Sequence, residues 1–522
     1  MNVADSNPTG NPNSGPALTP EQLCEQIDQM ADALKDNVRK AAKSGDSFDS
    51  IERNIHQTVF LIGRQAVELF VRLQGDGDLG DALKTGAGNT LHRSRQKTWT
   101  TIRSIFGTHR FEQCTYASGP KKAIALRPVS ARMSLPAGRW SYLLQQWSQM
   151  LCVDSAYQQA MDNLQVILGG ARLSVDTAEK VNGQMGQAAG AYLDGLPKPA
   201  ADSESKLMVA TADCKGVPLV KEDAAKVAAF ETAKKNPGNR RMATVASVYT
   251  VDPHIRTAEE ITEALFRDEP DPAAPKRKRP EPANKITTAH MPEMDEQSDG
   301  SDLRISGIHV AMAWMIGQIT QRRRPGQVLI VLMDGQESLW ETLKLHLSFG
   351  PRTVAILDIV HALAYVWEAA GLFEKDDGRR RAFARERLLR ILRGELSGVI
   401  KGLRRLGTTH ELQGEAARDL VRICGYLEKH SHRMRYDDYL RRGYPIASGV
   451  IEGACRHLVK DRMERSGMRW TLEGARSMLH VRAAFQSEHW ESFLADRMSG
   501  EAERTHPHRD LLKDYQPMTL AC

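Results

Sequence analysis

The amino-acid sequence predicts an α/β protein, in which a mixed sheet is interrupted by an α-helical insertion and preceded by a mainly α-helical N-terminal domain. Short apolar runs typical of strands begin near residue 207 and alternate with helix-like segments as far as residue 370. Before residue 195 and after residue 371, apolar residues recur instead at the three- and four-residue spacing of helices. A chain of 522 residues is also too long for one compact domain, so we expect about two or three folded units.

The composition excludes several classes of protein. We find no apolar run near the roughly 18 residues that a membrane span requires, and residues 1–20 lack the basic start and apolar core of a secretory signal. The seven cysteines are scattered without a CxxC pair, which argues against a zinc ribbon or a disulfide framework. We therefore expect a soluble, cytoplasmic protein without a membrane partner. The net charge of +6 is only a mild indication of a polyanionic partner.

Changes in composition and periodicity predict the domain boundaries. A linker with Pro and Ser separates the front helices from the first strands, and a polar, Pro-containing segment inside the α/β core cannot form a core of its own. Gly and Asp predict a loop at residues 75–90. We predict, in order, a disordered tail (1–18), a helical domain (19–195), the α/β core (207–370) with a disordered insertion (265–303), a basic helical insertion (371–443), the C-terminal helices of the core (444–500) and a second tail (501–522).

The order of elements in the core indicates a particular kind of sheet. Three strands are expected first, followed by alternating helices and strands, in the order β-β-β-α-β-α-β-α. That order is compatible with an RNase H-like domain, in which three antiparallel strands precede alternating helices and parallel strands. The predicted strands are 207–212, 217–220, 242–251, 328–333 and 353–357, and the predicted helices are 308–322, 338–347 and 361–370.

Two of the strand-like runs end in an aspartate that is soon followed by glycine, at Asp213 and Asp334. Open α/β sheets place their sites at the carboxyl ends of strands. If the two strands are neighbours at the sheet centre, the carboxylates converge within reach of one hard cation such as Mg²⁺. A turn after a strand explains either residue alone equally well. Asp358 also ends a strand, so the second ligand is either Asp334 or Asp358, unless Asp358 is the N-cap of the next helix.

A third ligand is expected from a helix, and Glu452 is the best candidate. Ser448 can cap this helix and Gly467 can end it. A surface ion pair between Glu452 and Arg456 is the simpler explanation for an isolated helix. The basic residues around Glu452 favour a metal ligand that faces DNA phosphates instead. The residues expected to contact DNA here are Arg456, Lys460 and Arg462.

The three carboxylates together predict a reaction. Two divalent ions held by Asp213, Asp334 and Glu452 would activate water or a DNA 3′-hydroxyl and stabilise the leaving oxygen. No protein nucleophile is then required. We expect two Mg²⁺ ions, with Mn²⁺ as a substitute.

The helical insertion carries a strongly one-sided charge. Between residues 379 and 405, ten Arg or Lys residues stand against two Glu residues. A solvated helix face is the usual explanation for charged helices, but so large an excess is better explained by contact with phosphates. The candidates for DNA contact in this insertion are Arg379, Arg380, Arg381, Arg404 and Arg405.

Five strings of residues together resemble one known family. They are DCKGVP (213–218), MATVASVYTV (242–251), DGQ (334–336), LDIVH (357–361) and GVIEGACRHLVKDRME (449–464). They resemble the Kra-type bacterial insertion-sequence transposases, which are relatives of the eukaryotic Mutator group. The likeness runs from about residue 207 to residue 493, and the string around Glu452 is its most specific part.

The resemblance implies a DDE transposase with an RNase H-like fold, which cleaves DNA and transfers strands at the ends of an insertion sequence. Its partners would be double-stranded DNA, both the terminal inverted repeats and the target, and a homodimer or higher oligomer would form on the DNA. The setting would be the nucleoid of a bacterial cytoplasm. In the family the second catalytic aspartate ends the fourth strand, which maps to Asp334. An Asp-x-x-His motif follows the fifth, which maps to Asp358 and His361 in a supporting role, although a capping or core role suits His361 equally.

The front domain matches the family less well. Relatives often carry cysteine pairs in this region, and their absence argues against a zinc-binding module. The helical domain 19–195 would then bind the DNA ends through helices and basic side chains. Its candidates are Arg93, Arg95, Lys97, Arg103 and Arg110.

Two other functions are compatible with the sequence. One is an RNase H-like, metal-dependent nuclease, which would hydrolyse DNA without joining it. The long helical insertion and the string around Glu452 argue against that class. The other is a domesticated transposase that acts as a DNA-binding protein, but such a protein is expected to have lost a carboxylate, and all three are present.

Overall fold

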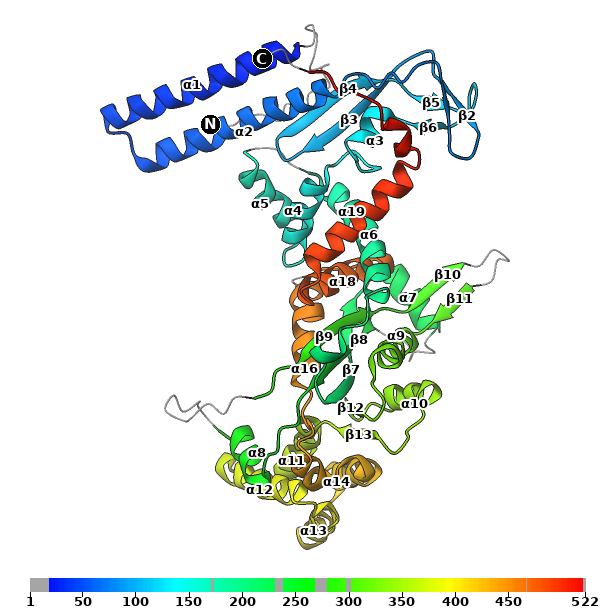
Figure 1. Ribbon diagram of the computed structural model, residues 1–522. Helices are drawn as coiled ribbons and strands as arrows, with labels where there is room; N and C mark the ends of the chain where they lie inside the picture. The colour runs from blue at the N-terminus through cyan, green and yellow to red at the C-terminus, as the bar shows by residue number, and fades with distance from the viewer. Residues whose placement is uncertain are drawn as a thin grey trace. The chain divides into compact units, whose positions relative to one another are not determined.

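The computed structural model describes residues 18–169, 173–230, 238–267, 279–296, 302–465 and 467–519. Its contacts divide the chain into two compact units, Met1–Val181 with Glu491–Cys522, and Asn182–Trp490 (Figure 1). All but the last residue of the predicted tail 1–18 lies outside the described residues. None of the described helices combines the length and the apolar character that crossing a membrane requires.

The first unit begins with two long helices, α1 (Pro20–Ser44) and α2 (Phe48–Leu73). A capping box starts α1, because the Thr19 hydroxyl accepts from the backbone N–H of Gln22 and the Gln22 side chain accepts from that of Thr19. Gly45 ends α1 with φ 74°, a left-handed conformation that favours glycine. The later helices are α3 (Pro128–Arg132), α4 (Tyr142–Cys152), α5 (Tyr157–Ile167), α6 (Val175–Asp194) and α19 (Trp490–Thr505).

The N-terminal domain also contains strands, which the sequence analysis missed. They form two small sheets, with the orders β1-β2-β5-β6 and β3-β4, and β1 lies inside the predicted loop 75–90. These strands are short and rich in Thr and charged residues, so they lack the apolar alternation that identifies a strand. They are β1 (Ala82–Lys84), β2 (Thr90–Arg93), β3 (Thr98–Ser104), β4 (Gly107–Gln113), β5 (Tyr116–Ala117) and β6 (Ile124–Leu126).

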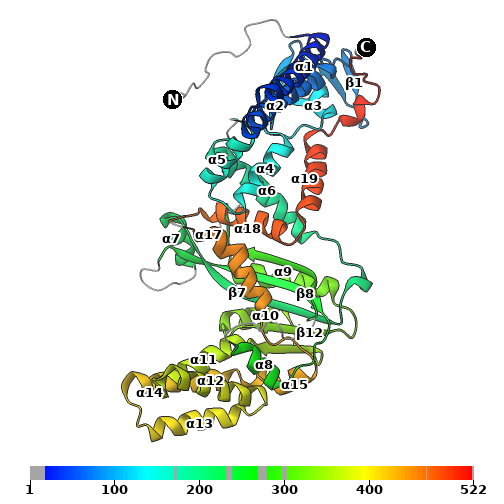
Figure 2. The same cartoon turned by 90° about the vertical axis from the view of Figure 1, so that its left-hand side faces the viewer.

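The second unit has a mixed α/β fold built on a five-stranded sheet with the order β13-β12-β7-β8-β9. The strands β7, β8 and β9 pair antiparallel, whereas β12 and β13 continue the sheet in parallel with β7. Figure 2 shows β7 and β8 passing behind the helix that ends in α17 (Asp461–Met463). The strands are β7 (Leu207–Pro218), β8 (Arg240–Val251), β9 (Ala283–His290), β12 (Val328–Met333) and β13 (Thr353–Leu357).

Two predictions about these strands were wrong: two predicted strands are one, and one strand was not predicted. The number of antiparallel strands before the parallel ones is nevertheless three, as predicted. The predicted strands 207–212 and 217–220 belong to one strand, β7, which ends at Pro218 and pairs with β8 along its whole length. The third strand is β9, inside the segment 265–303 that was predicted to be disordered. Much of that strand is buried yet polar: Thr287 Oγ1 lies 2.9 Å from Ser247 Oγ, and Thr288 Oγ1 lies 2.8 Å from His290 Nε2. Residues 268–278 and 297–301 of the segment lie outside the described residues.

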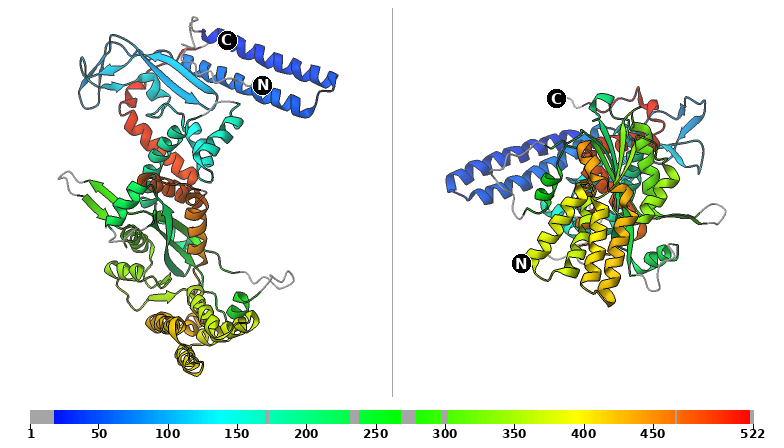
Figure 3. Two further views of the ribbon diagram at one scale, coloured as in Figure 1. Left: turned by 180° about the vertical axis from the view of Figure 1, so that it is seen from behind. Right: turned by 90° about the horizontal axis from the view of Figure 1, so that it is seen from below.

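Helices cover both faces of the sheet. On one face α9 (Gly307–Arg322) packs on β7, β8 and β9. On the other, α16 (Gly449–Ala454) contacts β7 and β8, as the views from front and back show (Figures 1 and 3). The remaining elements around the sheet are α7 (Lys221–Phe230), α8 (Ala258–Leu265), β10 (Glu293–Glu296), β11 (Asp302–Ile305), α10 (Glu337–His346), α17 (Asp461–Met463) and α18 (Leu472–Gln486).

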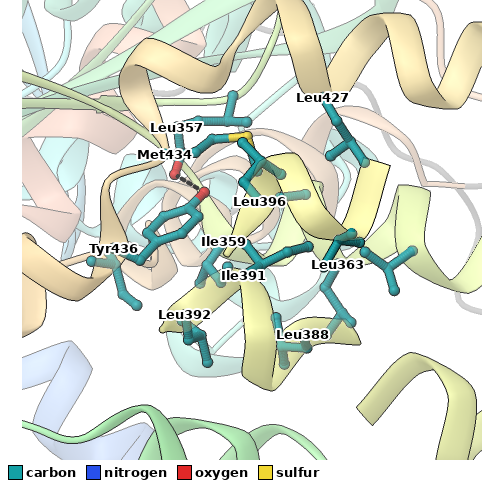
Figure 4. Close-up of a cluster of buried hydrophobic side chains, with 14 of the residues drawn as sticks. Leu357, Ile359, Leu363, Leu388, Ile391, Leu392, Leu396, Leu427, Met434 and Tyr436 are labelled. Atoms are coloured by element: carbon teal, nitrogen blue, oxygen red, sulfur yellow. Dashed lines mark hydrogen bonds between the residues drawn. The ribbon is translucent and has the colours of Figure 1, made fainter. Parts of the chain in front are cut away.

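The predicted insertion is helical, and its core is continuous with the end of the sheet. Leu357 at the end of β13 packs into the same cluster as Leu388, Ile391 and Leu396 of the insertion (Figure 4). The Tyr436 hydroxyl donates to the Leu357 carbonyl at 2.9 Å, which fixes the returning chain against β13. The core helix α11 (Ile359–Phe373) leads into the insertion, whose helices are α12 (Asp377–Leu392), α13 (Leu396–Thr409), α14 (Gly414–Lys429) and α15 (Tyr436–Arg441).

Candidate active site

Asp213 and Asp334 belong to neighbouring strands at the centre of the sheet. β12 pairs with β7 as far as Val331 opposite Ala210, and each aspartate follows three residues further along its own chain. Asp334 directly follows β12, as predicted. Asp213 does not end a strand, because β7 continues for five more residues and pairs Asp213 with Val245 of β8. The two residues therefore stand at the same level of the sheet, where β12 stops and β7 goes on.

Burial and nearby negative charge raise the pKa of the Asp334 carboxyl. Burial is the largest cause, and the charges of Asp213 and Asp358 add to it. The backbone N–H of Gln336, which donates to Oδ1 at 2.9 Å, and the His361 ring act in the opposite direction. Four of the residues singled out in the sequence therefore lie within electrostatic range of one another.

Glu452 joins this group from a helix. It lies in α16, which packs against β7, the strand that carries Asp213, and against the neighbouring strand β8. Partial burial raises the pKa of the Glu452 carboxyl, the charges of Asp358 and Asp213 raise it further, and His361 opposes them. Glu452 and Asp334 thus share three neighbours, although 118 positions separate them in the chain.

The carboxylates of Asp213, Asp334 and Glu452 are suitable ligands for a hard cation, but their side chains do not converge on one metal-binding point. Carboxylate oxygens are the ligands that Mg²⁺ prefers. Burial is the main cause of the raised pKa values of Asp334 and Glu452, and the neighbouring negative charges that add to it are ones that a cation would neutralise. Within the described residues, no three His, Cys, Asp or Glu side chains stand close enough together to hold a metal ion. Coordination would require these side chains to turn toward a common point.

Two cysteines hold the Asp213 carboxylate, and the sequence analysis missed both. The Cys455 thiol donates to Asp213 Oδ2 at 3.4 Å, and the backbone N–H of Cys214 donates to Oδ1 at 2.6 Å. Burial raises the pKa of the Cys214 thiol to about 11 and that of Cys455 higher still, so both are protonated at neutral pH. Cys455 can donate only because it is protonated. The sequence feature that could have identified Cys455 is its position three residues after Glu452, on the same face of the helix.

A π-helical segment brings Cys455 to this position. Residues Cys455–Lys460 form π-helical turns between α16 and α17, and the segment packs on β7. π-helical turns inside helices are rare and occur frequently at functional sites. Here the π-helical turns connect α16, which carries Glu452, to α17, which carries the buried residues Arg462 and Met463.

Asp358 is fully buried and hydrogen-bonded on both oxygens. Its Oδ1 accepts from the backbone N–H of Val360 at 2.7 Å, so Asp358 is the N-cap of α11, one of the two roles considered for it. Its Oδ2 accepts from the backbone N–H of Ser448 at 2.9 Å and from the Ser448 hydroxyl. Ser448 is the N-cap residue of the Glu452 helix, as predicted, but its side chain makes no capping hydrogen bond to that helix. Asp358 instead anchors the start of the Glu452 helix to the end of β13.

The basic residues near Glu452 divide into buried and exposed ones. Arg462 was predicted to contact DNA, but its side chain is buried over the Trp470 ring, 4.7 Å from the centroid. That prediction was wrong, because the helix turns Arg462 into the core, where stacking on an indole replaces water. Arg456 and Lys460 are exposed.

The surplus charge of the insertion is partly neutralised by acids that lie elsewhere in the chain. Arg393 pairs with Glu259 of α8 at 2.7 Å, and Arg404 pairs with Glu428 of α14 at 2.7 Å. The local count therefore exaggerated the free positive charge. Of the five residues predicted for DNA contact, Arg380 pairs with Asp377, Arg381 donates to the Phe266 carbonyl, and Arg379 and Arg405 are exposed without an ion pair in the described part of the chain.

Several basic residues of the front domain are also engaged. Arg93 pairs with Asp78 and Asp81, and Lys97 pairs with Asp76 at 2.9 Å. The remaining candidates differ in their surroundings. Burial lowers the pKa of Arg103, the Arg110 guanidinium lies 4.4 Å from the Trp99 ring centroid, and Arg95 is exposed.

A tyrosine of the insertion, Tyr426, lies next to the candidate active site and stacks on a second tyrosine. Tyr426 of α14 stacks on Tyr365 of α11 with ring centroids 3.7 Å apart. A Cβ added at Gly335, next to Asp334, would lie 2.3 Å from the Tyr426 hydroxyl oxygen and 2.5 Å from Cε2. Only glycine at position 335 leaves room for Tyr426 beside Asp334. Gly335, first interpreted as part of a turn, therefore also allows the insertion to pack next to the site.

We predict that Gly335→Ala lowers the free energy of unfolding by about 1–3 kcal/mol, the usual cost of overpacking. Gly425→Ala is the matched control on α14, because a Cβ there meets nothing within 4 Å. That change should raise stability by up to about 1 kcal/mol, since alanine is the better helix former. Urea unfolding measures both. Equal effects of the two substitutions would contradict the close approach of Tyr426.

Comparisons with known proteins leave the family open. No protein-family model matches the chain, and no curated protein matches it. Among solved structures, the chain has some similarity to the Drosophila P element transposase strand transfer complex, with a TM-score of 0.21 and 11% sequence identity. The match covers 69% of this chain and 83% of that one. A TM-score this low carries no argument, so the function rests on the residues themselves.

Proposed function

We propose that this chain is a DDE-type DNA transposase, which cleaves and joins DNA phosphodiester bonds with Asp213, Asp334 and Glu452 as its metal ligands. One observation carries the proposal. Two aspartates stand at the same level of adjacent central strands, and a glutamate from a distant helix shares their electrostatic surroundings.

The strand order supports an RNase H-like core. Three antiparallel strands, β7, β8 and β9, are followed in sequence by β12 and β13, which extend the sheet in parallel from β7. This is the arrangement that the resemblance to Kra-type insertion-sequence transposases implies. The helical insertion, which separates β13 from the Glu452 helix, belongs to the same pattern.

The donor set fits magnesium, with Mn²⁺ as a substitute. Two such ions would activate water or a DNA 3′-hydroxyl and stabilise the leaving oxygen. The chain's own residues orient the ligands: Cys455 and the Cys214 N–H hold Asp213, and the N–H of Gln336 holds Asp334. Asp358 fixes the start of the Glu452 helix through Ser448, which we regard as its supporting role. His361, which favours the ionised carboxylates electrostatically, is the second supporting residue.

Double-stranded DNA, as terminal repeats and as target, is the proposed partner. The exposed cations Arg456 and Lys460 on the Glu452 helix, and Arg379 and Arg405 on the insertion, are the candidates for phosphate contact. We infer a bacterial protein that acts at the nucleoid as a homodimer or higher oligomer.

The test is Mg²⁺-dependent cleavage and joining of a labelled duplex that carries one end of the element encoding this chain. Asp213→Asn and Glu452→Gln should each reduce both steps at least about 10³-fold, because each removes a metal ligand while leaving DNA binding intact. Glu473→Gln is the control, since Glu473 is an exposed carboxylate in the first turn of α18 and is none of the proposed metal ligands or DNA contacts.

Other outcomes would assign the protein differently. A wild type that cuts the duplex but never joins it would be a nuclease. A wild type that binds the duplex and cuts it with neither Mg²⁺ nor Mn²⁺ would be a DNA-binding protein only.

A further inference from the structure

The helices α1 and α2 form a hairpin with almost no interior. They pair with each other, and the end of α2 rests on β4 (Figures 1 and 3). Of all residues in the two helices, Leu23 and Val71 are the buried ones. Helices of 25 and 26 residues depend on tertiary packing for their stability, and one hairpin seam provides little of it. A further surface is therefore expected to cover them.

One face of α2 carries an apolar stripe that no described part of the chain covers. Its members are spaced by seven, four, seven and four residues, an 11-residue repeat that keeps them on one face of the helix. The face toward the body of the unit is a different one, where Val67 and Val71 pack with Ile102 and Phe111. The stripe consists of Phe48 (78% exposed), Ile55 (36%), Val59 (48%), Ala66 (exposed) and Phe70 (54%).

The ends and the centre of the stripe coincide when it is reversed, whereas Ile55 then lies opposite Gly63 and Ala66 opposite Glu52. Val59 lies at the centre of the stripe, with Phe48 eleven residues before it and Phe70 eleven residues after it. Two copies of α2 that pair antiparallel about Val59 therefore bring each phenyl ring against a phenyl ring of the other copy. A two-fold interface must be complementary in this way, since the same patch is used on both subunits.

The charges of α1 favour the same antiparallel arrangement. The half of α1 before residue 33 carries four acidic side chains and no basic one, and the half after it carries four basic side chains and one acidic. Glu21, Asp28 and Lys35 follow one another at seven-residue spacing on one face. When α2 pairs antiparallel, the acidic half of α1 lies beside the basic half of the second copy. Lys35, which pairs with Asp32 of its own helix at 2.7 Å, then also faces Asp28 across the two-fold axis. Parallel pairing would set like charges together.

We propose that the α1–α2 hairpin is a homodimerisation surface, on which a second copy of this chain completes an antiparallel four-helix bundle centred on Val59. Four-helix bundles bury this kind of seam with short loops between antiparallel neighbours, as Gly45 to Ser47 provides here. The proposal is independent of the catalytic function, because it concerns the chain without DNA or metal.

The first test compares two substitutions at equally exposed apolar residues of the same helix. Val59 is 48% exposed and lies on the stripe, whereas Leu61 is 53% exposed and lies on another face. Sedimentation of the full chain without DNA should give a dimer for the wild type and for Leu61→Glu. Val59→Glu should shift the dissociation constant at least about 100-fold, with unchanged helical content by circular dichroism. A monomeric wild type, or a Val59→Glu variant that stays dimeric, overturns the proposal.

The second test fixes the orientation. Val59→Cys places a thiol at the two-fold axis and should form a disulfide-linked dimer on oxidation, beyond the level of the wild type. In the antiparallel arrangement the two Phe48 positions are about 33 Å apart, at a rise of 1.5 Å per residue, so Phe48→Cys should not cross-link. Cross-linking through Phe48 and not through Val59 would overturn the antiparallel bundle.

A charge exchange tests the α1 contact. Asp28→Lys and Lys35→Glu should each weaken the dimer alone, because each sets like charges across the axis. A mixture of the two variants should form heterodimers in which opposite charges meet again. Failure of the mixture to recover dimer would contradict the pairing of Asp28 with Lys35.

Discussion

Asp334→Asn is expected to reduce Mg²⁺-dependent cleavage at least about 10³-fold while making the metal-free protein more stable. The substitution keeps an oxygen that accepts from the N–H of Gln336. It removes a negative charge that stands near Asp213 and Asp358 and whose carboxyl has a raised pKa, first through burial and then through those charges. The melting temperature should rise by about 2 °C, the usual scale for a gain near 1 kcal/mol.

Asp358→Asn should have the opposite effect on stability. Asp358 is buried, and its Oδ2 accepts from both the backbone N–H and the hydroxyl of Ser448. Its Oδ1 accepts from the backbone N–H of Val360. An amide has one accepting oxygen, so either the Val360 N–H or the two Ser448 donors are left facing its NH2 group. The expected cost is about 1–3 kcal/mol. If Asp334→Asn lowers stability and keeps activity while Asp358→Asn abolishes activity without loss of stability, the roles of the two aspartates are reversed.

The pH dependence of the Asp334 effect follows from the direction of its pKa shift. A carboxyl whose pKa is raised in the folded state contributes stability at low pH and loses it as the pH rises through the folded value. The wild type should therefore lose stability relative to Asp334→Asn as the pH rises from about 4, and the difference should level off once Asp334 is ionised. Thermal melts between pH 4 and 8 measure it. Added Mg²⁺ should reduce the difference, because it stabilises the ionised wild type only.

Arg322→Met is expected to lower the free energy of unfolding by about 3–5 kcal/mol, the cost of leaving a buried charge without its partner. Arg322 Nε donates to Glu204 Oε1 at 2.9 Å, and both side chains are almost fully buried, at 0% and 2% exposed. Burial by itself raises the pKa of Glu204, and hydrogen bonds from Arg322 and Thr250 outweigh it, so the carboxylate is ionised. The pair also reaches β9, because Arg322 Nη2 donates to the Asn284 carbonyl at 2.9 Å.

The matched control is Arg393→Met, which removes an Arg–Glu pair of similar length at the surface. Arg393 and Glu259 lie 2.7 Å apart but are 49% and 55% exposed. Surface pairs contribute about 0–1 kcal/mol, so little change is expected. Denaturant unfolding of both variants gives the comparison. A loss below about 1 kcal/mol for Arg322→Met would show that Glu204 is solvated or protonated in the native state.

The elements predicted best are those whose pattern depends on local sequence. The strand before Asp334 is a continuous apolar run because its side chains are buried on both faces of the sheet. The helices of the insertion were predicted from the three- and four-residue spacing of their apolar residues. The strand β9 could not be found in this way. Its buried Thr287 and Thr288 are satisfied by hydrogen bonds to distant residues, which composition does not reveal.

The candidate site shows the same limit. Asp213, Asp334 and Glu452 stand out by their neighbours in sequence, and the structure brings their charges within range of one another. The partners that engage the surrounding residues come from far along the chain. Ser448 meets Asp358 across 90 positions, Cys455 meets Asp213 across 242, and Arg462 turns out to be buried. Neither spacing nor charge counts carry information about such contacts.

The π-helical segment Cys455–Lys460 changes the direction in which side chains point at one end of the helix relative to the other end. A π-helical turn holds one residue more than an α-helical turn. Deleting any one residue from the segment would restore a plain α-helix and rotate one end against the other by about 100°. Glu452 and Cys455 would then leave the sheet, or Arg462 would leave Trp470. The number of residues between the carboxylate and the buried guanidinium is thus fixed more strictly than their identities.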